Sequence, residues 1–141
     1  MTHTVTYRLL DDATKIRQVQ EATLNTEEFG LQPTHGLHGT PEWWGNIASG
    51  VLPMHTLKGM IIKVYMGSMG DWPEFRVREE DGTESSWTRE AQSRELDAAY
   101  QIGCSVEVDY VVERFKAKSW SGPEETKSVV EIRVGSACNE A

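Results

Sequence analysis

The sequence contains few cysteines and no long apolar run, and these two absences exclude whole classes of protein. Its 141 residues include only Cys104 and Cys138, too few for a disulfide-held fold and without the paired spacing of a zinc site. We therefore expect free thiols. No segment is long enough to span a bilayer, and the opening MTHTVTYRLLDD has no basic stretch followed by an apolar one. We expect no membrane association and a cytoplasmic location.

Basic residues are also scarce. Lys and Arg number 14 against 22 Asp and Glu, which gives a formal net charge of −8. This balance opposes broad binding to polyanions such as DNA backbones or anionic membranes. Hydrophobic residues make up 38% and charged residues 26% of the chain, which is ordinary for a folded domain built around one core.

Signatures of catalysis and of metal binding are absent as well. We find no phosphate loop, dinucleotide glycine fingerprint, paired-histidine zinc helix or serine elbow. The best metal candidate is HGLHG, whose His35 and His38 could join His55 and Asp71, but two histidines in a glycine loop specify little. We predict no metal, no cofactor and no catalytic residue, and an enzyme with an unrecognised site remains the third alternative.

Apolar and polar residues alternate in five segments after residue 57, and this period of two predicts five β-strands. In the second segment we expect Phe75 and Val77 to be buried while Arg76 and Arg78 are exposed. Asp81-Gly82 then provides a tight hairpin turn. The five segments are KGMIIKVYM (58–66), EFRVREE (74–80), TESSWT (83–88), SVEVDYVV (105–112) and SVVEIRV (128–134). The predicted inward residues of the last two are Val106, Val108, Tyr110 and Val112, then Val130, Ile132 and Val134.

The segment between the third and fourth strands, REAQSRELDAAYQIG (89–103), is rich in helix formers and ends in a glycine, which predicts a helix. Three strands, a helix and two strands is an order that resembles the OB-fold, a five-stranded barrel. This resemblance is one of topology and covers residues 58–134. It implies a mainly β protein with a small OB-like barrel and a helix between strands three and four. SH3-like and Sm-like barrels could produce much of the same alternation.

Residues 1–57 differ in pattern and predict a helical N-terminal extension packed on the barrel, and residues 135–141 predict a mobile tail. VTYRLL could add an edge strand, and a helix is expected after Asp11 or Asp12. A second helix is expected in TPEWWGNIASG, with Thr40 as its cap and Gly50 as its stop. Because such a short helix is unstable alone, its apolar residues must pack against the barrel or a second subunit. The predicted interface residues are Trp43, Trp44 and Ile47.

A candidate ligand-binding face follows from the barrel prediction. In an OB-like barrel the loops after strands one and four rim the face formed by strands two and three. Two tryptophans on that rim would form a platform worth about 1 to 3 kcal/mol for each stacked base. Alternatively, Trp72 closes the mouth of the barrel. The predicted binding residues are Trp72, Arg76, Arg78, Lys116, Lys118 and Trp120.

These observations favour a binding module over an enzyme. Because the chain is acidic, we predict a protein partner or self-association, and single-stranded nucleic acid is the alternative ligand.

Overall fold

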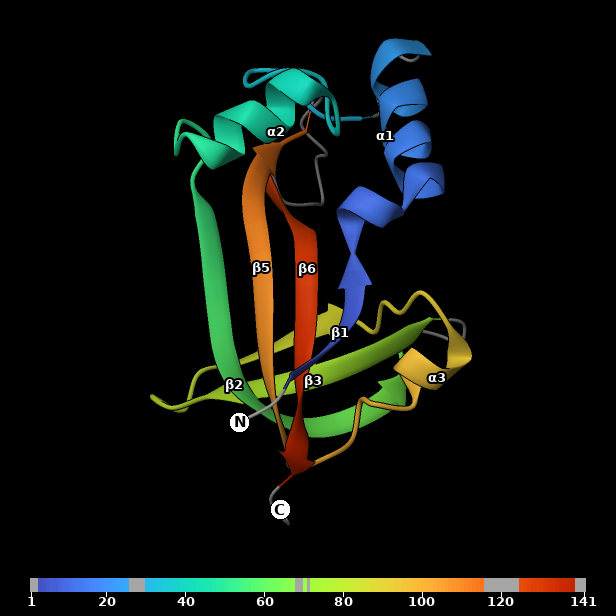
Figure 1. The fold of residues 1–141 in the computed structure, drawn as a ribbon, viewed down its shortest axis with the longest axis vertical. Coiled ribbons are helices and arrows are strands. Elements are labelled where there is room, and N and C mark those ends of the chain that lie inside the picture. The colour runs from blue at the N-terminus through green and yellow to red at the C-terminus, as the bar shows by residue number, and fades with distance from the viewer. Residues whose placement is uncertain (1–2, 26–29, 68–69, 71, 116–124, 139–141) are drawn as a thin grey trace. The chain divides into compact units, whose positions relative to one another are not determined.

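The computed structural model describes residues 3–138 except 26–29, 68–69, 71 and 116–124, with the side chains of 136–138 also outside the description (Figure 1). The strands are β1 (His3–Arg8), β2 (Met54–Met66), β3 (Pro73–Glu79), β4 (Glu84–Thr88), β5 (Cys104–Arg114) and β6 (Glu125–Cys138). The helices are a short 3-10 turn (Leu9–Asp11), α1 (Ala13–Asn25), α2 (Pro41–Ala48) and α3 (Arg94–Asp97). None of the described helices is both long and apolar enough to cross a membrane.

The six strands form one antiparallel sheet in the order β1-β6-β5-β2-β3-β4. Strands β1 and β4 are its two edges, so the described strands form an open sheet, and the prediction of a closed OB-like barrel is wrong. The alternation of side chains specifies which residues share a face of a strand but not which strands are neighbours. Strand β1, which we assigned to the N-terminal extension, pairs with β6.

The chain divides into two compact units. Unit 1 comprises residues 1–8, 56–109 and 131–141, and unit 2 comprises residues 9–55 and 110–130. The predicted domain boundary after residue 57 stays a prediction.

The β3–β4 hairpin of unit 1 confirms the predicted register. Phe75 and Val77 are fully buried, while Arg76 and Arg78 keep partly exposed side chains on the opposite face of β3. At the turn, the Asp81 carboxylate accepts a hydrogen bond from the Thr83 amide at 2.9 Å. Gly82, between these two residues, adopts a φ of 91°. Strand β2 is strongly bent in Figure 1, and its pairing with β3 shifts register between Ile61 and Lys63.

The helix predicted across 89–103 is wrong for most of its length, since only α3 is helical. Contacts with β1 explain the difference. The backbone amide of Gln92 donates to the Thr6 carbonyl at 3.1 Å, and its side chain donates to the Arg8 carbonyl at 2.7 Å. These contacts hold a non-helical backbone before α3, which packs against β1, so tertiary pairing overrides helix propensity (Figure 1).

Cys104 at the start of β5 corrects a second expectation. It is buried, as a small core residue would be, but it is disulfide-bonded rather than a free thiol.

The helices of unit 2 begin where the sequence predicts. Thr40 caps α2 by accepting a hydrogen bond from the Trp43 amide, and Asp12 accepts one from the Lys15 amide at the start of α1. Near the end of α1, Thr23 is buried and its hydroxyl accepts from the Leu31 amide at 3.1 Å. Leu24, the next residue of this helix, is largely exposed.

The burial pattern changes phase within β5. Val106 and Val108 are buried as predicted, but Val111 is buried in place of Tyr110 and Val112, and the acidic Glu113 is buried after it.

Strand β6 shows a related change. Ile132 and Val134 are buried as predicted, whereas Val129 is buried in place of Val130.

Candidate protein-binding surfaces

Trp72 is exposed in unit 1, as a binding residue must be. Its side chain is 57% exposed, and its indole nitrogen donates to the Thr88 hydroxyl of β4 at 3.1 Å. This bond holds the ring at the edge of the sheet. Met66 and Pro73 pair across the same β2–β3 connection, and Met66 is also exposed. Trp72 therefore adds to an exposed apolar surface rather than closing a barrel.

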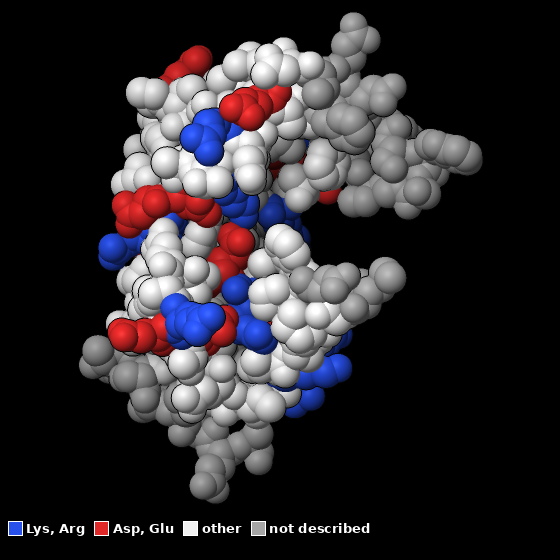
Figure 2. All heavy atoms as spheres, turned by 90° about the vertical axis from the view of Figure 1, so that its right-hand side faces the viewer, with Lys and Arg blue, Asp and Glu red and all other residues white. Residues whose placement is uncertain are grey.

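The two arginines predicted for the same face are already paired. Glu84 binds Arg76 at 2.9 Å and Arg78 at 3.2 Å, and these hydrogen bonds hold the pKa of the Glu84 carboxyl below its ordinary value. Lys and Arg are interspersed with Asp and Glu on the face drawn in Figure 2. Phosphate groups would have to compete with Glu84 for both guanidinium groups, which weakens the case for single-stranded nucleic acid.

The remaining predicted binding residues, Lys116, Lys118 and Trp120, lie outside the described residues. Their convergence with Trp72 stays a prediction.

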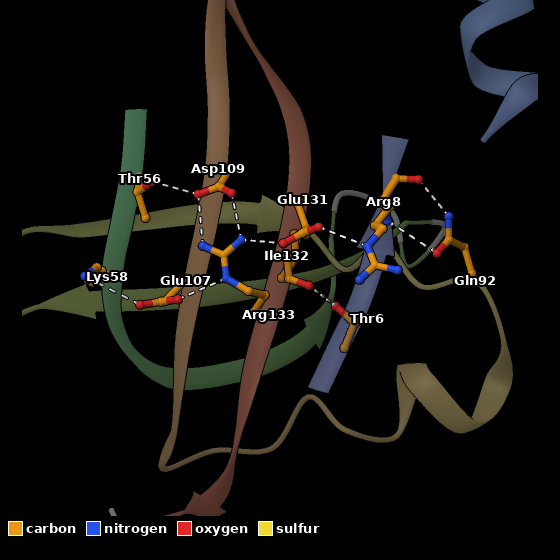
Figure 3. Close-up of polar contacts among 10 residues, drawn as sticks. All are labelled: Thr6, Arg8, Thr56, Lys58, Gln92, Glu107, Asp109, Glu131, Ile132 and Arg133. Carbon is orange, nitrogen blue, oxygen red and sulfur yellow. Dashed lines mark hydrogen bonds and ion pairs between the residues drawn. The ribbon is translucent and has the colours of Figure 1, made fainter. Parts of the chain in front are cut away.

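A second polar surface of unit 1 centres on Arg133 of β6, and sequence reasoning missed it. The guanidinium donates to both carboxylate oxygens of Asp109, at 2.7 and 3.0 Å, and to Glu107 at 3.0 Å (Figure 3). It also binds Glu131 on its own strand. One cation is thus shared by three carboxylates, all of them no more than about a quarter exposed.

This charged ladder continues onto the neighbouring strands. Thr56 donates to Asp109 at 2.7 Å, Lys58 pairs with Glu107 at 3.6 Å, and Arg8 pairs with Glu131 at 3.1 Å (Figure 3). We define the charged ladder as Arg8, Thr56, Lys58, Glu107, Asp109, Glu131 and Arg133.

The ladder shifts the pKa values of its members. Hydrogen bonds from Arg133 hold the pKa of Glu107 below its ordinary value. Burial raises the pKa of Asp109, but the hydrogen bonds from Arg133 and Thr56 outweigh it and the pKa is lowered. The hydrogen bonds to Asp109, Glu131 and Glu107 raise the pKa of Arg133 against the opposing effect of burial. Glu107, Asp109 and Arg133 are therefore ionised at neutral pH.

The signal that could have revealed the ladder is the polar half of the alternation. Glu107, Asp109, Glu131 and Arg133 are the outward positions between the predicted inward residues of the last two strands.

The predicted interface residues lie in unit 2. Trp43 is fully buried and packs on His38 and Trp44, with ring centroids 4.5 and 4.8 Å away. Trp44 and Ile47 are partly exposed. The chain itself covers Trp43, and self-association through the other two stays a prediction.

The histidine candidates are also in unit 2. His38 is buried, whereas His35 and His55 line a cavity with Glu113 and Glu125. Within the described ranges, no group of three or more His, Cys, Asp or Glu residues is arranged to hold a metal ion.

Comparison with known proteins adds what the geometry alone does not give. The model of one protein family, described as immunity protein RhsI2, matches residues 2–135. The chain belongs to this family. Among curated proteins, none matches the chain.

The match to the RhsI2 immunity family includes residues of both units. Trp72, Trp43 and the charged ladder all lie inside the matched range.

Proposed function

We propose that this protein is an immunity protein that binds a cognate Rhs toxin and neutralises it by direct protein–protein contact. The observation that carries the proposal is the RhsI2 family match across residues 2–135. The acidic charge, which disfavours nucleic acid, and an exposed tryptophan on a sheet edge support a protein partner.

We place part of the toxin contact on the β2–β3–β4 surface of unit 1, at Trp72, Arg76 and Arg78. Tryptophan and arginine are the side chains most enriched among residues that dominate binding energy. Trp72 is held in place by Thr88, and both arginines are held by Glu84, so little side-chain freedom is lost when a partner binds.

The other predicted residues extend this proposal. Lys116, Lys118 and Trp120 are proposed as further contacts with the toxin, and Trp44 with Ile47 as a surface for self-association. A cytoplasmic location is likewise proposed, and cell fractionation tests it.

The test is a binding and protection experiment with the purified cognate Rhs toxin. We expect the wild-type chain to form a complex and to restore growth of cells that express the toxin. Trp72→Ala should weaken the complex by about tenfold or more, because truncation of a hot-spot aromatic has effects of this size. Leu24→Ala, which truncates an exposed apolar residue in unit 2, is the control and should bind like the wild type.

Either of two results contradicts the proposal. One is a wild-type chain that forms no complex with the toxin, and the other is growth restored without a complex.

A further inference from the structure

Unit 2 contains a cavity of about 320 Å³ whose lining includes charged residues. Its walls come from the segment before α2, the segment leading into β2, and the ends of β5 and β6 that belong to this unit. Two carboxylates, one guanidinium and two imidazoles contribute to it. The lining residues are Gln32, Thr34, His35, Pro53, His55, Val112, Glu113, Arg114 and Glu125.

Glu113 is the buried charge in this lining, with a side chain only 7% exposed. One carboxylate oxygen lies 3.1 Å from Nδ1 of His38, and the other accepts a hydrogen bond from the indole nitrogen of Trp43 at 3.3 Å. The carboxylate is thus fixed in place by two side chains of unit 2.

His38, the closer of these two side chains, is almost fully enclosed. Its side chain is 3% exposed, and its Nε2 has no hydrogen-bond partner among the described residues. Protonation would place a second N–H at Nε2, and a buried donor without an acceptor is costly. A ring with its single proton on Nδ1 donates to Glu113 without burying this second N–H. With this tautomer both groups that hold Glu113 are neutral donors, and neither balances its charge.

The second carboxylate of the cavity is weakly held. Glu125 lies 3.8 Å from Arg114, and both side chains are more than half exposed. A long, exposed ion pair contributes little to stability. A cation from outside can therefore bind Glu125 without breaking a strong contact.

We propose that this cavity accepts a lysine or arginine side chain of the toxin, with its cationic group bound by Glu113 and Glu125. The inference rests on the proposed function and names the chemistry of one anchor. The fold has already removed Glu113 from water, so an incoming cation gains its attraction without a new desolvation cost for this carboxylate. The net charge of −8 further favours a basic partner surface.

Titration calorimetry with the purified cognate Rhs toxin tests the proposal. We expect Glu125→Gln to weaken binding by about tenfold and Glu113→Gln by about thirtyfold, since truncating one member of a buried charge pair has effects of this size or larger. Glu21→Gln, at an exposed carboxylate of α1 in the same unit, is the matched control and should leave the affinity unchanged. Circular dichroism verifies that each variant is folded.

The outcomes separate the two proposals. A toxin that binds the wild type, Glu125→Gln and Glu113→Gln equally well overturns the cavity inference and leaves the proposed function intact. A toxin that does not bind the wild type overturns the proposed function itself.

A second measurement avoids any substitution in Glu113. Nitrogen-15 NMR of His38 should show the neutral ring protonated at Nδ1 at neutral pH. An imidazolium signal would mean that Glu113 already has a cation beside it, and the reason for a basic side chain in the cavity would be lost.

Discussion

Asp109 and Glu113 both lie on β5 and are both 8% exposed, yet their surroundings differ. In unit 1, Asp109 receives two hydrogen bonds from the guanidinium of Arg133. In unit 2, Glu113 receives hydrogen bonds from the imidazole of His38 and the indole of Trp43. The same degree of burial is thus accompanied by a guanidinium in one unit and by an imidazole and an indole in the other.

This difference separates a structural role from a binding role. A carboxylate that is paired within the chain stabilises the fold and offers little net charge to a partner. Glu113, held by an imidazole and an indole, forms no ion pair with a Lys or Arg among the described residues, and the partner can provide this cation. Burial alone would not distinguish these two residues, whereas the identity of the donors does.

The largest expected effect comes from Arg133→Met, which removes the cation shared by Glu107, Asp109 and Glu131. We expect the free energy of unfolding to fall by about 3 kcal/mol, because removal of Arg133 leaves the buried carboxylate of Asp109 without a cation. Urea denaturation followed by tryptophan fluorescence measures the change.

Arg78→Met is the matched control, since Arg78 also binds a carboxylate but lies on an exposed part of β3. It should cost less than about 1 kcal/mol. Equal losses for the two variants would show that the charged ladder has no special role in stability.

The next largest effect compares Asp109→Asn with Glu113→Gln. We expect the first to cost about 2 kcal/mol, because a bidentate contact with Arg133 loses its charge. The second should cost about 1 kcal/mol. One hydrogen-bond acceptor is lost, but a buried charge without a cation is removed at the same time. Urea denaturation of both variants at neutral pH measures the difference.

The order of these two losses is the informative result. Suppose that Glu113→Gln destabilises the free protein more than Asp109→Asn does. The negative charge of Glu113 is then balanced within its own chain, and the two carboxylates no longer differ in this respect.

The parts of the fold that were predictable from the sequence are those with regular local patterns. The hairpin around Asp81-Gly82 and the helix after Thr40 follow from turn and capping residues, and the burial of Phe75 and Val77 follows from strict alternation. Closure of a barrel depends on which strands pair, and local alternation carries no information about pairing. The prediction of a closed barrel was wrong for this reason.

The site residues show the same limit. In VDYVVER, apolar residues occupy both faces of the strand at Val111 and Val112, so the alternation does not indicate which face is buried. Glu113 was missed because its burial depends on His38 and Trp43, which are distant in sequence. The sequence shows the polar positions of the charged ladder. Which carboxylates pair with Arg133, however, depends on which strands are neighbours.

The smallest expected effect concerns the stability of the fold at acidic pH. It again compares the wild type with Arg133→Met. The pKa values of Glu107 and Asp109 lie below their ordinary 4.5 and 3.8. Lowered pKa values of this kind stabilise the fold above the ordinary value, and the stabilisation is lost as the pH falls through the folded-state pKa. The wild type should therefore lose stability between about pH 5 and pH 3.

Arg133→Met should lose less over the same range, because the hydrogen bonds that lower both pKa values are absent and protonation of the carboxylates relieves their repulsion. The stability gap between wild type and variant should narrow on acidification by on the order of 1 kcal/mol. Urea denaturation of both proteins at intervals from pH 7 to pH 3 measures the gap. A gap that stays constant would mean that Arg133 stabilises unit 1 through packing of its aliphatic stem rather than through charge, and Asp109 would then resemble Glu113 in lacking an effective cation.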